Sequence, residues 1–531
     1  MIKILVADPL AEEGMKKFTE TPGVQADVKT GLSEDDLAKA VGEYDGMIIR
    51  SGAKVTAKVL ANPGRLRAIA RAGVGVDNVD LDAATKAGIL VMNTPDGNTI
   101  STAEQTMNLM LAISRHTPKG DAHVREGKWE RKKFTGTQLA GKTLGIVGFG
   151  RIGRTVAERA LAFGMKVIAY DPFFTGDSAM DGQVSMTKSL DELLPNADYI
   201  TLHTVLNSDT KGMINAATIA KMKDGVRLVN CARGGLLNEA DVAEALKSGK
   251  IAAAGIDVYS TEPPAKDNPL LSAPNTVLAP HLGASTEEAQ LTVTIDAAES
   301  LLSFLLRDQI RWPVNVAGLP SQLTERDKRY VDLARRMGVI LSKLCTAGIQ
   351  TASVRTHGES LQPITRMIAR QILADTLTPH LGTKLNLINV DAAVQSRGIK
   401  VEAVTDQSVS TLMDTVAAKV TTPEGCQEVV GEVFLDGKPR ILAVNGYQMN
   451  LVPEGEMLLI FNDDRPGVIG IVGTIFGDHK INIADMMLSR QNNTALMLLK
   501  LDAPIPAEVL AKLEAQKPAI IKVLPVTLPP L

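Results

Sequence analysis

The stretch "TLGIVGFGRIGRTVAERALAFGMKVIAYD", residues 143–171, decides how this chain folds. An apolar strand candidate runs into Gly148-Phe149-Gly150-Arg151-Ile152-Gly153, a helical segment follows, and a second strand candidate ends at Asp171. In such a unit the first glycine allows the tight turn, the second lets the backbone approach a pyrophosphate, and the third allows close helix–strand packing. The helix N-terminus then faces the anion. The stretch therefore predicts a dinucleotide-binding fold.

Asp171 indicates which dinucleotide is bound. It lies 18 residues after Gly153, where a carboxylate can bind the adenine ribose hydroxyls and would repel a 2′-phosphate. The next residues, "PFF", supply no cation that could hold such a phosphate. We therefore expect NAD rather than NADP. A glycine-rich turn alone can be purely structural, so this prediction depends on the whole unit of strands, helix and terminal acid.

Length and composition exclude several classes of protein. A chain of 531 residues is too long for one core and predicts three or four domains. A formal net charge of −3 gives no support for a nucleic-acid partner. Cys231, Cys345 and Cys426 are far apart, which favours neither disulfides nor a metal site and fits a reducing cytoplasm. The apolar run in "MIKILVADPL" is too short for a signal peptide, and no segment approaches the roughly 18 apolar residues of a membrane span.

The first ~310 residues alternate short apolar runs with helical segments. The strand candidates are 3–9, 46–51, 68–73, 89–94, 143–150, 166–172, 199–204, 226–233, 252–259 and 276–281. Strands that are apolar on both faces indicate parallel sheets covered by helices on both sides. Ten strands exceed one ordinary sheet, so we expect two Rossmann or flavodoxin-like α/β domains with a cleft between them. The break is expected within 95–101, and the long helix 286–306 returns to the first domain.

The remaining chain has a different texture. Helices over 324–347 and 361–376 are followed by alternating strands with a hairpin signal at Asp436–Gly437, which indicates an α+β domain. The last ~75 residues read β-α-β-β-α-β, a ferredoxin-like order. The expected domains are residues 1–97 with 286–311, residues 98–285, residues 316–450 and residues 455–531.

Hydride transfer to NAD needs a base, because hydride leaves a carbinol carbon only when its hydroxyl proton is also removed. Histidine suits that role, and His281 follows the strand candidate "TVLAP". Arg233 follows another strand, and its guanidinium can hold a carboxylate with two parallel hydrogen bonds. Glu262 is expected at the end of a third strand, where it can fix the histidine tautomer. Open α/β sheets bind ligands at such strand ends, so we expect the three side chains to meet.

Each of these residues alone has a simpler interpretation. Arg233 is then a surface cation, Glu262 a helix cap and His281 a turn residue. Their joint placement at three strand ends, downstream of one dinucleotide-binding unit, favours the catalytic interpretation over the three simpler ones.

Four motifs together resemble the D-isomer-specific 2-hydroxyacid dehydrogenases. They are "GFGRIG…YDP" (148–172), "NCARGG" (230–235), "DVYSTEPP" (257–264) and "APHLGAST" (279–286). "IRSGAKVT" (49–56), "RAGVGVDNVDLDAATKAGILVMNTPDGN" (71–98) and "KWERKKFTGTQLAGKTLGI" (128–146) are similar to the family's long-form members, so the resemblance covers essentially the whole chain. It implies a catalytic set of Arg233, Glu262 and His281. The cofactor contacts that it implies are Val74, Gly148, Gly150, Arg151, Ile152, Gly153, Asp171, Thr204, Cys231, Ala232, Arg233, Asp257, His281, Leu282, Gly283 and Ala284.

The long-form members act on 3-phospho-D-glycerate, so the resemblance implies its oxidation at C2 to 3-phosphohydroxypyruvate, at the entry to serine synthesis. Arg233 and the amides of Gly73–Val76 are expected to hold the carboxylate, and Arg50 and Arg71 the phosphate. The full set of expected substrate contacts is Arg50, Ser51, Arg71, Gly73, Val74, Gly75, Asn98, Arg233 and His281. Surface salt bridges remain the alternative for Arg50 and Arg71. Val74 departs from the family, where many members have threonine, so a hydroxyl contact to the cofactor is lost.

The segment around Trp129 is expected to assemble subunits. The basic run Arg131-Lys132-Lys133 is by default a solvated face, but in the family this region lies near the dimer interface. An exposed tryptophan is a good interface anchor. We expect a homodimer through the NAD domain, with a tetramer as a further possibility.

The C-terminal stretch "NDDRPGVIGIVGTIFGDHKINIADM" (462–486) resembles an ACT domain, a module that binds amino acids at subunit interfaces. Asn462, Asp464 and Asn482 match the positions that hold an amino-acid effector in related enzymes, which suggests L-serine as a regulator. An ACT domain that serves only assembly is the alternative. Residues 316–450 resemble the intervening domain of long-form members, where Lys438 and Arg440 either form an anion pocket or are solvated strand ends.

Two other functions compete with this prediction. Within the class, the runner-up is an enzyme for an unphosphorylated acid such as glyoxylate or hydroxypyruvate. In a different class, some transcriptional corepressors keep this fold and catalytic triad as NAD-sensing binding proteins. Such a protein needs neither a phosphate pocket nor an amino-acid-binding module, and the sequence indicates both.

Overall fold

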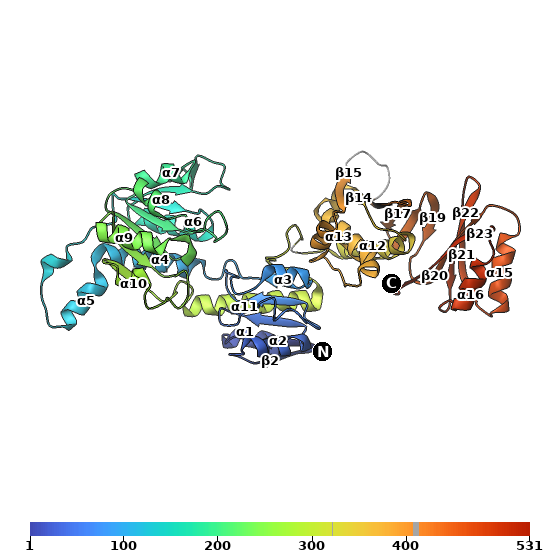
Figure 1. The fold of residues 1–531 in the computed structure, drawn as a ribbon, viewed down its shortest axis with the longest axis horizontal. Coiled ribbons are helices and arrows are strands. Elements are labelled where there is room, and N and C mark those ends of the chain that lie inside the picture. Colours follow the sequence, from blue (N-terminus) through green and yellow to red (C-terminus); the bar gives the residue numbers. More distant parts are fainter. Residues whose placement is uncertain (321, 407–413) are drawn as a thin grey trace.

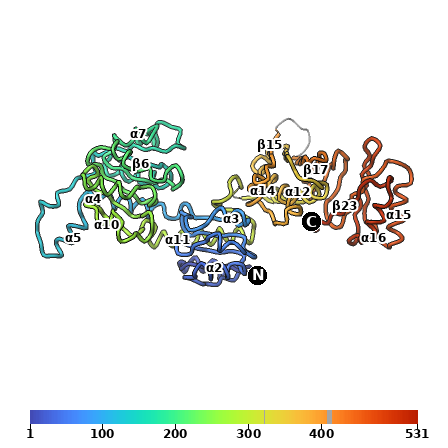
Figure 2. Tube along the Cα trace, viewed as in Figure 1, coloured from blue at the N-terminus to red at the C-terminus, as the bar shows by residue number. Residues whose placement is uncertain are grey.

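The computed structural model describes residues 1–320, 322–406 and 414–531 of the chain. Four sheets form four bodies in a row, with the dinucleotide-binding domain at one end and the ferredoxin-like domain at the other (Figures 1 and 2). The predicted fold class, two parallel α/β domains followed by two α+β domains, is confirmed.

The first domain has a five-stranded parallel sheet in the order β2-β1-β3-β4-β5. Its strands are β1 Ile2–Val6, β2 Val24–Val28, β3 Gly46–Ile49, β4 Ala68–Arg71 and β5 Leu90–Met92, and its helices are α1 Glu12–Thr19, α2 Glu34–Ala40 and α3 Leu81–Lys86. The long helix α11, Glu287–Arg307, returns to this sheet as predicted and packs against α1, β3 and β4. By length and composition alone α11 could cross a membrane, but 61% of its apolar window is buried in the domain core.

The second domain has an eight-stranded sheet in the order β13-β12-β11-β10-β6-β7-β9-β8, parallel except for the short edge pair β8–β9. The strands are β6 Thr143–Val147, β7 Lys166–Tyr170, β8 Ser178–Ala179, β9 Val184–Met186, β10 Tyr199–Leu202, β11 Val226–Asn230, β12 Ile251–Ile256 and β13 Thr276–Leu278. The helices are α4 Thr99–Arg115, α6 Arg151–Ala162, α7 Leu190–Leu193, α8 Ala216–Lys221, α9 Glu239–Ser248 and α10 Pro269–Ser272. The polar strands β2, β8 and β9 were not predicted, because they lack an apolar run.

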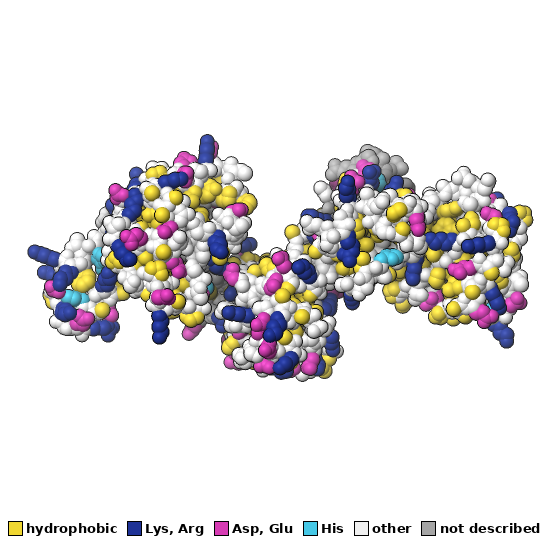
Figure 3. Space-filling view, viewed as in Figure 1, with side chains coloured by type: hydrophobic (Ala, Val, Ile, Leu, Met, Phe, Trp, Pro, Cys, Tyr) yellow, Lys and Arg dark blue, Asp and Glu magenta, His cyan; other side chains and the backbone are white. Residues whose placement is uncertain are grey.

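A projecting arm leaves this domain at its outer end (Figure 1). It consists of α5, Thr117–Arg125, and the 3-10 turn η2, Arg131–Phe134, and neither element contains a buried residue. Trp129 lies between them with 76% of its surface exposed, and the space-filling view shows Lys and Arg side chains gathered at this end (Figure 3).

The third domain has a six-stranded sheet in the order β15-β14-β16-β17-β18-β19. Its elements are α12 Glu325–Leu344, β14 Thr351–His357, η5 Glu359–Ile364, α13 Thr365–Leu381, α14 Val390–Ser396, β15 Lys400–Asp406, β16 Thr415–Thr422, β17 Gly425–Val433, β18 Pro439–Val444 and β19 Tyr447–Leu451. The hairpin signal Asp436–Gly437 lies between β17 and β18 as predicted. This domain touches the first one, since the Asn386 side chain donates to the Gly88 carbonyl at 2.7 Å and Ile388 joins the first domain's core.

The C-terminal domain has an antiparallel sheet in the order β21-β22-β20-β23, as a ferredoxin-like fold requires. Its elements are β20 Gly455–Asp463, α15 Val468–Asp478, β21 Ile483–Gln491, β22 Thr494–Leu501, α16 Ala507–Glu514 and β23 Ile520–Leu528. One sheet face is covered by α15 and α16, and the other shares a continuous apolar core with the third domain. Arg336 of α12, almost fully buried, donates to the carbonyls of Pro453 and Pro529 across this junction.

Candidate active site

The glycine-rich turn between β6 and α6 has the shape that a dinucleotide needs. Gly148 has φ 95°, and a Cβ there would lie 2.4 Å from the His203 carbonyl oxygen, so only glycine fits. A Cβ on Gly153 would lie 2.2 Å from the Gly148 carbonyl oxygen, so this glycine permits close helix packing. A Cβ on Gly150 would meet nothing, and this N-cap residue makes no side-chain cap to α6. The first amides of α6 therefore face open space, where a pyrophosphate fits.

Asp171 is held against the same turn. Its carboxylate accepts hydrogen bonds from the backbone amides of Phe149, at 2.8 Å, and Phe173, at 2.9 Å. These two bonds fix the carboxylate at the end of β7, and each oxygen keeps a second lone pair for a ribose hydroxyl. Arg151, at the first position of α6, forms an ion pair of 2.5 Å with Asp96. The donor set therefore fits NAD, with one acid for the ribose and free amides and a guanidinium near the pyrophosphate.

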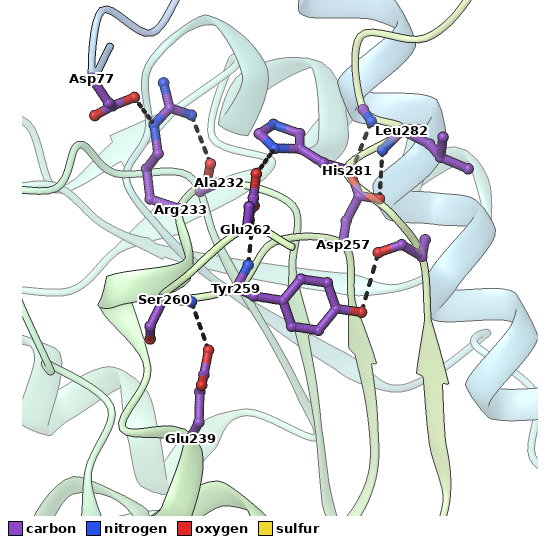
Figure 4. A network of polar contacts seen from close by, with 12 residues as sticks. Asp77, Ala232, Arg233, Glu239, Asp257, Tyr259, Ser260, Glu262, His281 and Leu282 are labelled. Atoms are coloured by element: carbon purple, nitrogen blue, oxygen red, sulfur yellow. Dashed lines mark hydrogen bonds and ion pairs between the residues drawn. The ribbon is translucent and has the colours of Figure 1, made fainter. Parts of the chain in front are cut away.

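His281 and Glu262 form a hydrogen-bonded pair. The Nδ1 atom of His281 lies 2.7 Å from the Oε2 of Glu262, whose Oε1 accepts from the Tyr259 amide at 3.1 Å (Figure 4). The predicted position of Glu262 needs correction, because β12 already ends at Ile256 and Glu262 lies in the loop beyond it. The side chain of His281 is 50% exposed, so its other nitrogen, Nε2, is accessible to a substrate. A carboxylate on Nδ1 with Nε2 open is the arrangement of a general base.

Asp257 fixes the backbone around the histidine. Its buried carboxylate accepts from the amides of Leu282 and Gly283, both at 2.8 Å, and its carbonyl accepts from the His281 amide at 2.8 Å (Figure 4). His281 itself has φ 56°, a left-handed conformation that is uncommon for a residue with a Cβ. Ser101 of α4 donates to the Gly283 carbonyl at 2.8 Å from the other side. The loop that carries His281 is therefore held by the carboxylate of Asp257, by the carbonyl of Asp257 and by the hydroxyl of Ser101.

Arg233 lies beside a loop of the first domain. Its Nε donates to Asp77 at 3.0 Å and its Nη1 to the carbonyl of Ala232 at 2.7 Å (Figure 4). A Cβ on Gly75 would lie 2.0 Å from its Nη2, so the guanidinium packs directly on the Gly73–Val76 loop. With 29% of its side chain exposed, Arg233 is not the free surface cation of the simpler interpretation.

A second guanidinium, that of Arg71, packs on the same loop. A Cβ on Gly73 would lie 1.8 Å from its Nη1, and its Nε is buried without a hydrogen-bond partner. Burial and, second, the positive charge of Arg233 lower the pKa of Arg71 to about 10. The carboxylates of Asp77 and Asp8 offset these two effects only in part, so the pair of guanidinium groups on this loop favours an anionic ligand. The surface-salt-bridge alternative does not describe Arg71.

Asp8 stabilises the loop that carries Arg50 and Ser51. Asp8 accepts from the amides of Arg50, at 2.7 Å, and Ala53, at 3.0 Å. Ser51 is exposed, and Arg50 borders a cavity of about 710 Å³. The cavity is lined by Ala11, Glu13, Arg50, Ser285, Thr286, Glu287, Glu288, Gln290 and Leu291. Asn98, whose role as a substrate donor stays a prediction, is the N-cap residue of α4, and its Oδ1 is buried without a hydrogen-bond partner among the described residues.

The remaining expected cofactor contacts lie at neighbouring strand ends. Cys231 is buried after β11, and burial raises the pKa of its thiol to about 12, so it remains neutral. Thr204 follows β10, and its amide would be 3.0 Å from a Cβ on Gly148. Ile152 is partly buried and packs against the apolar core of the second domain. The carbonyl of Val74 accepts from Asn93, at 2.6 Å, and that of Ala284 from Gln290, also at 2.6 Å, so both backbone segments are fixed.

The three expected effector residues have separate partners. Asp464 is paired with Arg490, whose Nη2 and Nε lie 2.6 and 2.7 Å from Oδ2. The Asn482 side chain donates to Asp502 at 2.7 Å, and the buried Asn462 side chain donates to the Asp463 carbonyl at 2.7 Å, while its Oδ1 has no partner among the described residues. Within the described ranges, no hydrogen bond joins the three to one another.

Sequence reasoning missed Asp77 and the bracing role of Asp257. A signal for Asp77 was present, because "DN" directly follows the glycine loop "GVGV" that was assigned to the substrate. Its partner Arg233 is 156 residues away, and no local pattern predicts a contact across that separation.

Three family models match consecutive parts of the chain. They are the D-isomer specific 2-hydroxyacid dehydrogenase NAD binding domain over residues 107–283, the D-3-phosphoglycerate dehydrogenase intervening domain over 327–445, and the ACT domain over 457–517. The match over 107–283 makes the second domain an NAD-binding domain.

Full-length relatives agree with these matches. The chain is 41% identical to a D-3-phosphoglycerate dehydrogenase of Methanocaldococcus jannaschii, over 97% of this chain and 98% of that protein. It is 40% identical to one of Archaeoglobus fulgidus, over 96% and 97% of the two chains. Among solved structures, a glyoxylate reductase from Paecilomyes thermophila matches with a TM-score of 0.55 and 32% identity, over 59% of this chain and 98% of that one.

Proposed function

The chain belongs to the D-3-phosphoglycerate dehydrogenases, and we propose that it oxidises 3-phospho-D-glycerate at C2 to 3-phosphohydroxypyruvate with NAD. This reaction is the first step of the phosphorylated route to L-serine. The observation that carries the proposal is the pair of His281 Nδ1 and Glu262 Oε2, 2.7 Å apart, on strand-end loops of an NAD-binding sheet.

The proton leaves through the histidine. His281 accepts the C2 hydroxyl proton at Nε2. NAD held by the glycine-rich turn and Asp171 would supply the hydride acceptor for C2. Glu262 stabilises the imidazolium that forms, because its carboxylate is already bonded to Nδ1. Asp257 keeps the base in place by holding the amides on either side of it. In the reverse direction the same imidazolium returns the proton to the carbonyl oxygen.

The substrate is oriented by its two anionic ends. Arg233 and the amides of Gly73–Val76 bind the carboxylate and polarise the reacting carbon. Arg71 and Arg50 bind the phosphate, and the packing of buried Arg71 on the Gly73–Val76 loop beside Arg233 supports this assignment. Phosphate recognition separates the reaction from that of enzymes for small unphosphorylated acids.

NAD is held by the turn and by the strand ends. The amides of Gly150–Gly153 with the Arg151 guanidinium take the pyrophosphate, and Asp171 takes the adenine ribose. Thr204, Cys231 and the loop 281–284 line the side toward the nicotinamide. The full expected set of cofactor and substrate contacts given above is part of this proposal.

Steady-state turnover tests the function directly. We expect NADH formation from 3-phosphoglycerate and NAD, with phosphohydroxypyruvate trapped by hydrazine, and much weaker activity with NADP. Rapid reduction of glyoxylate or hydroxypyruvate without turnover of 3-phosphoglycerate would overturn the proposal in favour of an unphosphorylated substrate. NADH binding without any turnover, combined with peptide binding, would favour a corepressor.

The proposal extends to regulation and assembly. The ACT domain takes an amino-acid effector at Asn462, Asp464 and Asn482, and L-serine, the end product, is the effector that we propose. The arm with exposed Trp129 forms a homodimer through the NAD domain. Three unpaired cysteines support a cytoplasmic location. Calorimetry with L-serine and analytical ultracentrifugation test the first two points.

A further inference from the structure

Asp77 connects the catalytic arginine to the opposite domain. It lies in the loop after β4 of the first domain, whereas Arg233 follows β11 of the NAD-binding domain. The two side chains meet at 3.0 Å between Oδ2 and Nε (Figure 4). Because guanidinium donors lie in one plane in fixed directions, a carboxylate at Nε determines where both amino groups point.

The rest of the guanidinium is placed accordingly. Nη1 donates to the Ala232 carbonyl at 2.7 Å, on the arginine's own loop. Nη2 is left facing Gly75, whose missing side chain makes room for it. The open edge of Arg233 therefore lies beside the Gly73–Val76 amides that are proposed to hold the substrate carboxylate.

The carboxylate of Asp77 is itself part of a braced loop. The neighbouring side chain, Asn78, donates to the carbonyls of Arg50, at 2.7 Å, and Ala53, at 2.6 Å. The Asn78 carbonyl in turn accepts from the Val55 amide at 2.8 Å. Asp77 is thus not a freely rotating surface acid, although 65% of its side chain is exposed.

Charge in the cluster supports a role for Asp77 before the substrate arrives. Arg71 and Arg233 both pack on the Gly73–Val76 loop, and their mutual repulsion contributes to the lowered pKa of Arg71. Asp77 is the carboxylate hydrogen-bonded to this cationic pair among the described residues. Without it, repulsion from Arg71 would turn the Arg233 guanidinium away from the loop.

We propose that Asp77 is a positioning residue for substrate binding: it orients the Arg233 guanidinium across the domain boundary toward the carboxylate-binding loop. The proposal rests on the proposed function for its kinetic consequence, but the placement of Arg233 can be tested without turnover.

The kinetic test compares Asp77→Ala and Asp77→Asn with the control Asp82→Asn, which removes a nearby exposed acid on α3. We expect Asp77→Ala to raise KM for 3-phosphoglycerate roughly tenfold, the effect of one partly exposed charge-assisted hydrogen bond, and to change kcat less. Asp77→Asn keeps an acceptor and should recover part of the loss. Asp77 is not among the proposed cofactor contacts, so the dissociation constant of NADH should stay within about twofold, as should all constants of Asp82→Asn.

The second test follows phenylglyoxal labelling of Arg233 by peptide mass spectrometry, without substrate. Arg233 should react about threefold or more faster in Asp77→Ala than in the unmodified protein or in Asp82→Asn, since an ion pair shields a guanidinium. Equal labelling rates would overturn the proposal. So would a loss of NADH affinity that matches the rise in KM, because that pattern indicates a general structural defect. If the unmodified protein fails to oxidise 3-phosphoglycerate while the labelling difference appears, the proposed function falls and the positioning role stands.

Discussion

The base of the NAD-binding domain and the effector residues of the ACT domain were both assigned from short motifs, yet the structure leaves them in different states. His281 is already bonded to Glu262, and half of its side chain is exposed, so its second nitrogen is accessible. Asp464, expected to bind an amino-acid amine, is instead bonded to a cation of its own chain, Arg490. The His281 site therefore has an accessible ring nitrogen. In the effector site, the carboxylate of Asp464 is already paired with the side chain of Arg490.

This difference teaches that a motif identifies residues but not their partners. Glu262 lies 19 positions from His281, and its two oxygens hold the His281 ring and the Tyr259 amide. Asp464, just after β20, lies 26 positions from Arg490 of β21, and nothing in "NDDRPG" indicates that contact. The catalytic site should therefore respond strongly to loss of a residue, and the effector site weakly.

The largest effect is expected from His281→Asn. Asparagine tolerates the left-handed backbone at this position, so the loop should be kept while the base is lost. We expect kcat to fall by roughly 10²–10⁴ with NADH affinity retained, as measured by steady-state kinetics and fluorescence titration. His116→Asn is the matched control, since His116 also has a left-handed backbone. Retained activity in His281→Asn would show that His281 is not the catalytic base.

Glu262→Gln should lower kcat less than His281→Asn does. The amide oxygen can still accept from Nδ1, but it cannot stabilise the imidazolium, and its NH₂ group would face the Tyr259 amide. We expect kcat to fall roughly 10- to 100-fold, in line with the loss of a charge-assisted hydrogen bond and of one partner. Glu244→Gln, at an exposed position of α9, serves as the control, and an unchanged kcat in Glu262→Gln would contradict a catalytic role for the pairing.

Acid should weaken the NAD-binding domain through His203. Burial lowers the pKa of His203 to about 3, against about 6.5 in an unfolded chain, so the unfolded state binds the proton more readily below pH 6.5. Stability is lost as pH falls, by at most about 2 kcal/mol between pH 7 and 5. His203→Gln should remove roughly 4–8 °C of the acid-induced drop in melting temperature of this domain, measured by calorimetry. The melting transition of the C-terminal domains, which lack His203, serves as the internal reference. An equal acid-induced drop in melting temperature of the NAD-binding domain in the unmodified protein and in His203→Gln would refute this prediction.

The smallest effect is expected at the effector site. Arg490→Ala frees Asp464 for an amine, and because the arginine is 68% exposed, the ion pair is worth at most about 1 kcal/mol. L-Serine should therefore bind up to about fivefold more tightly, measured by calorimetry on the full chain. Arg465→Ala, in the adjacent turn, is the control. Weaker binding in Arg490→Ala would mean that the arginine holds the ligand rather than competing with it.

Much of the fold could be predicted from the sequence. Ten apolar runs became ten strands of two parallel sheets, because a strand covered on both faces must be apolar throughout. The polar edge strands β2 and β8 could not be found that way, since an edge needs no such run. The ferredoxin-like order of the last domain is confirmed, but its shared core with α12 depends on contacts between residues far apart in sequence.

The candidate site was predictable where chemistry dictates residue type at a strand end. The structure pairs His281 with Glu262 and packs Arg233 beside the glycine loop, as expected for residues that follow parallel strands. The side-chain partners that complete the site, Asp77 for Arg233 and Arg490 for Asp464, lie across a domain boundary or a sheet. Sequence spacing carries no information about such encounters.

The apolar layer common to the third and fourth domains has a consequence for shorter versions of this protein. Met457, Leu459, Leu496 and Leu498 contribute to the same core as α12. The Nε of Arg336 donates to Asp332 on its own helix, whereas its Nη1 donates to the carbonyls of Pro453 and Pro529 outside the third domain. A chain that ended before β20 would expose this apolar sheet face to solvent and would remove the Pro529 carbonyl from Arg336. Removing the last domain alone would therefore require polar substitutions on the face of the third domain that it covers.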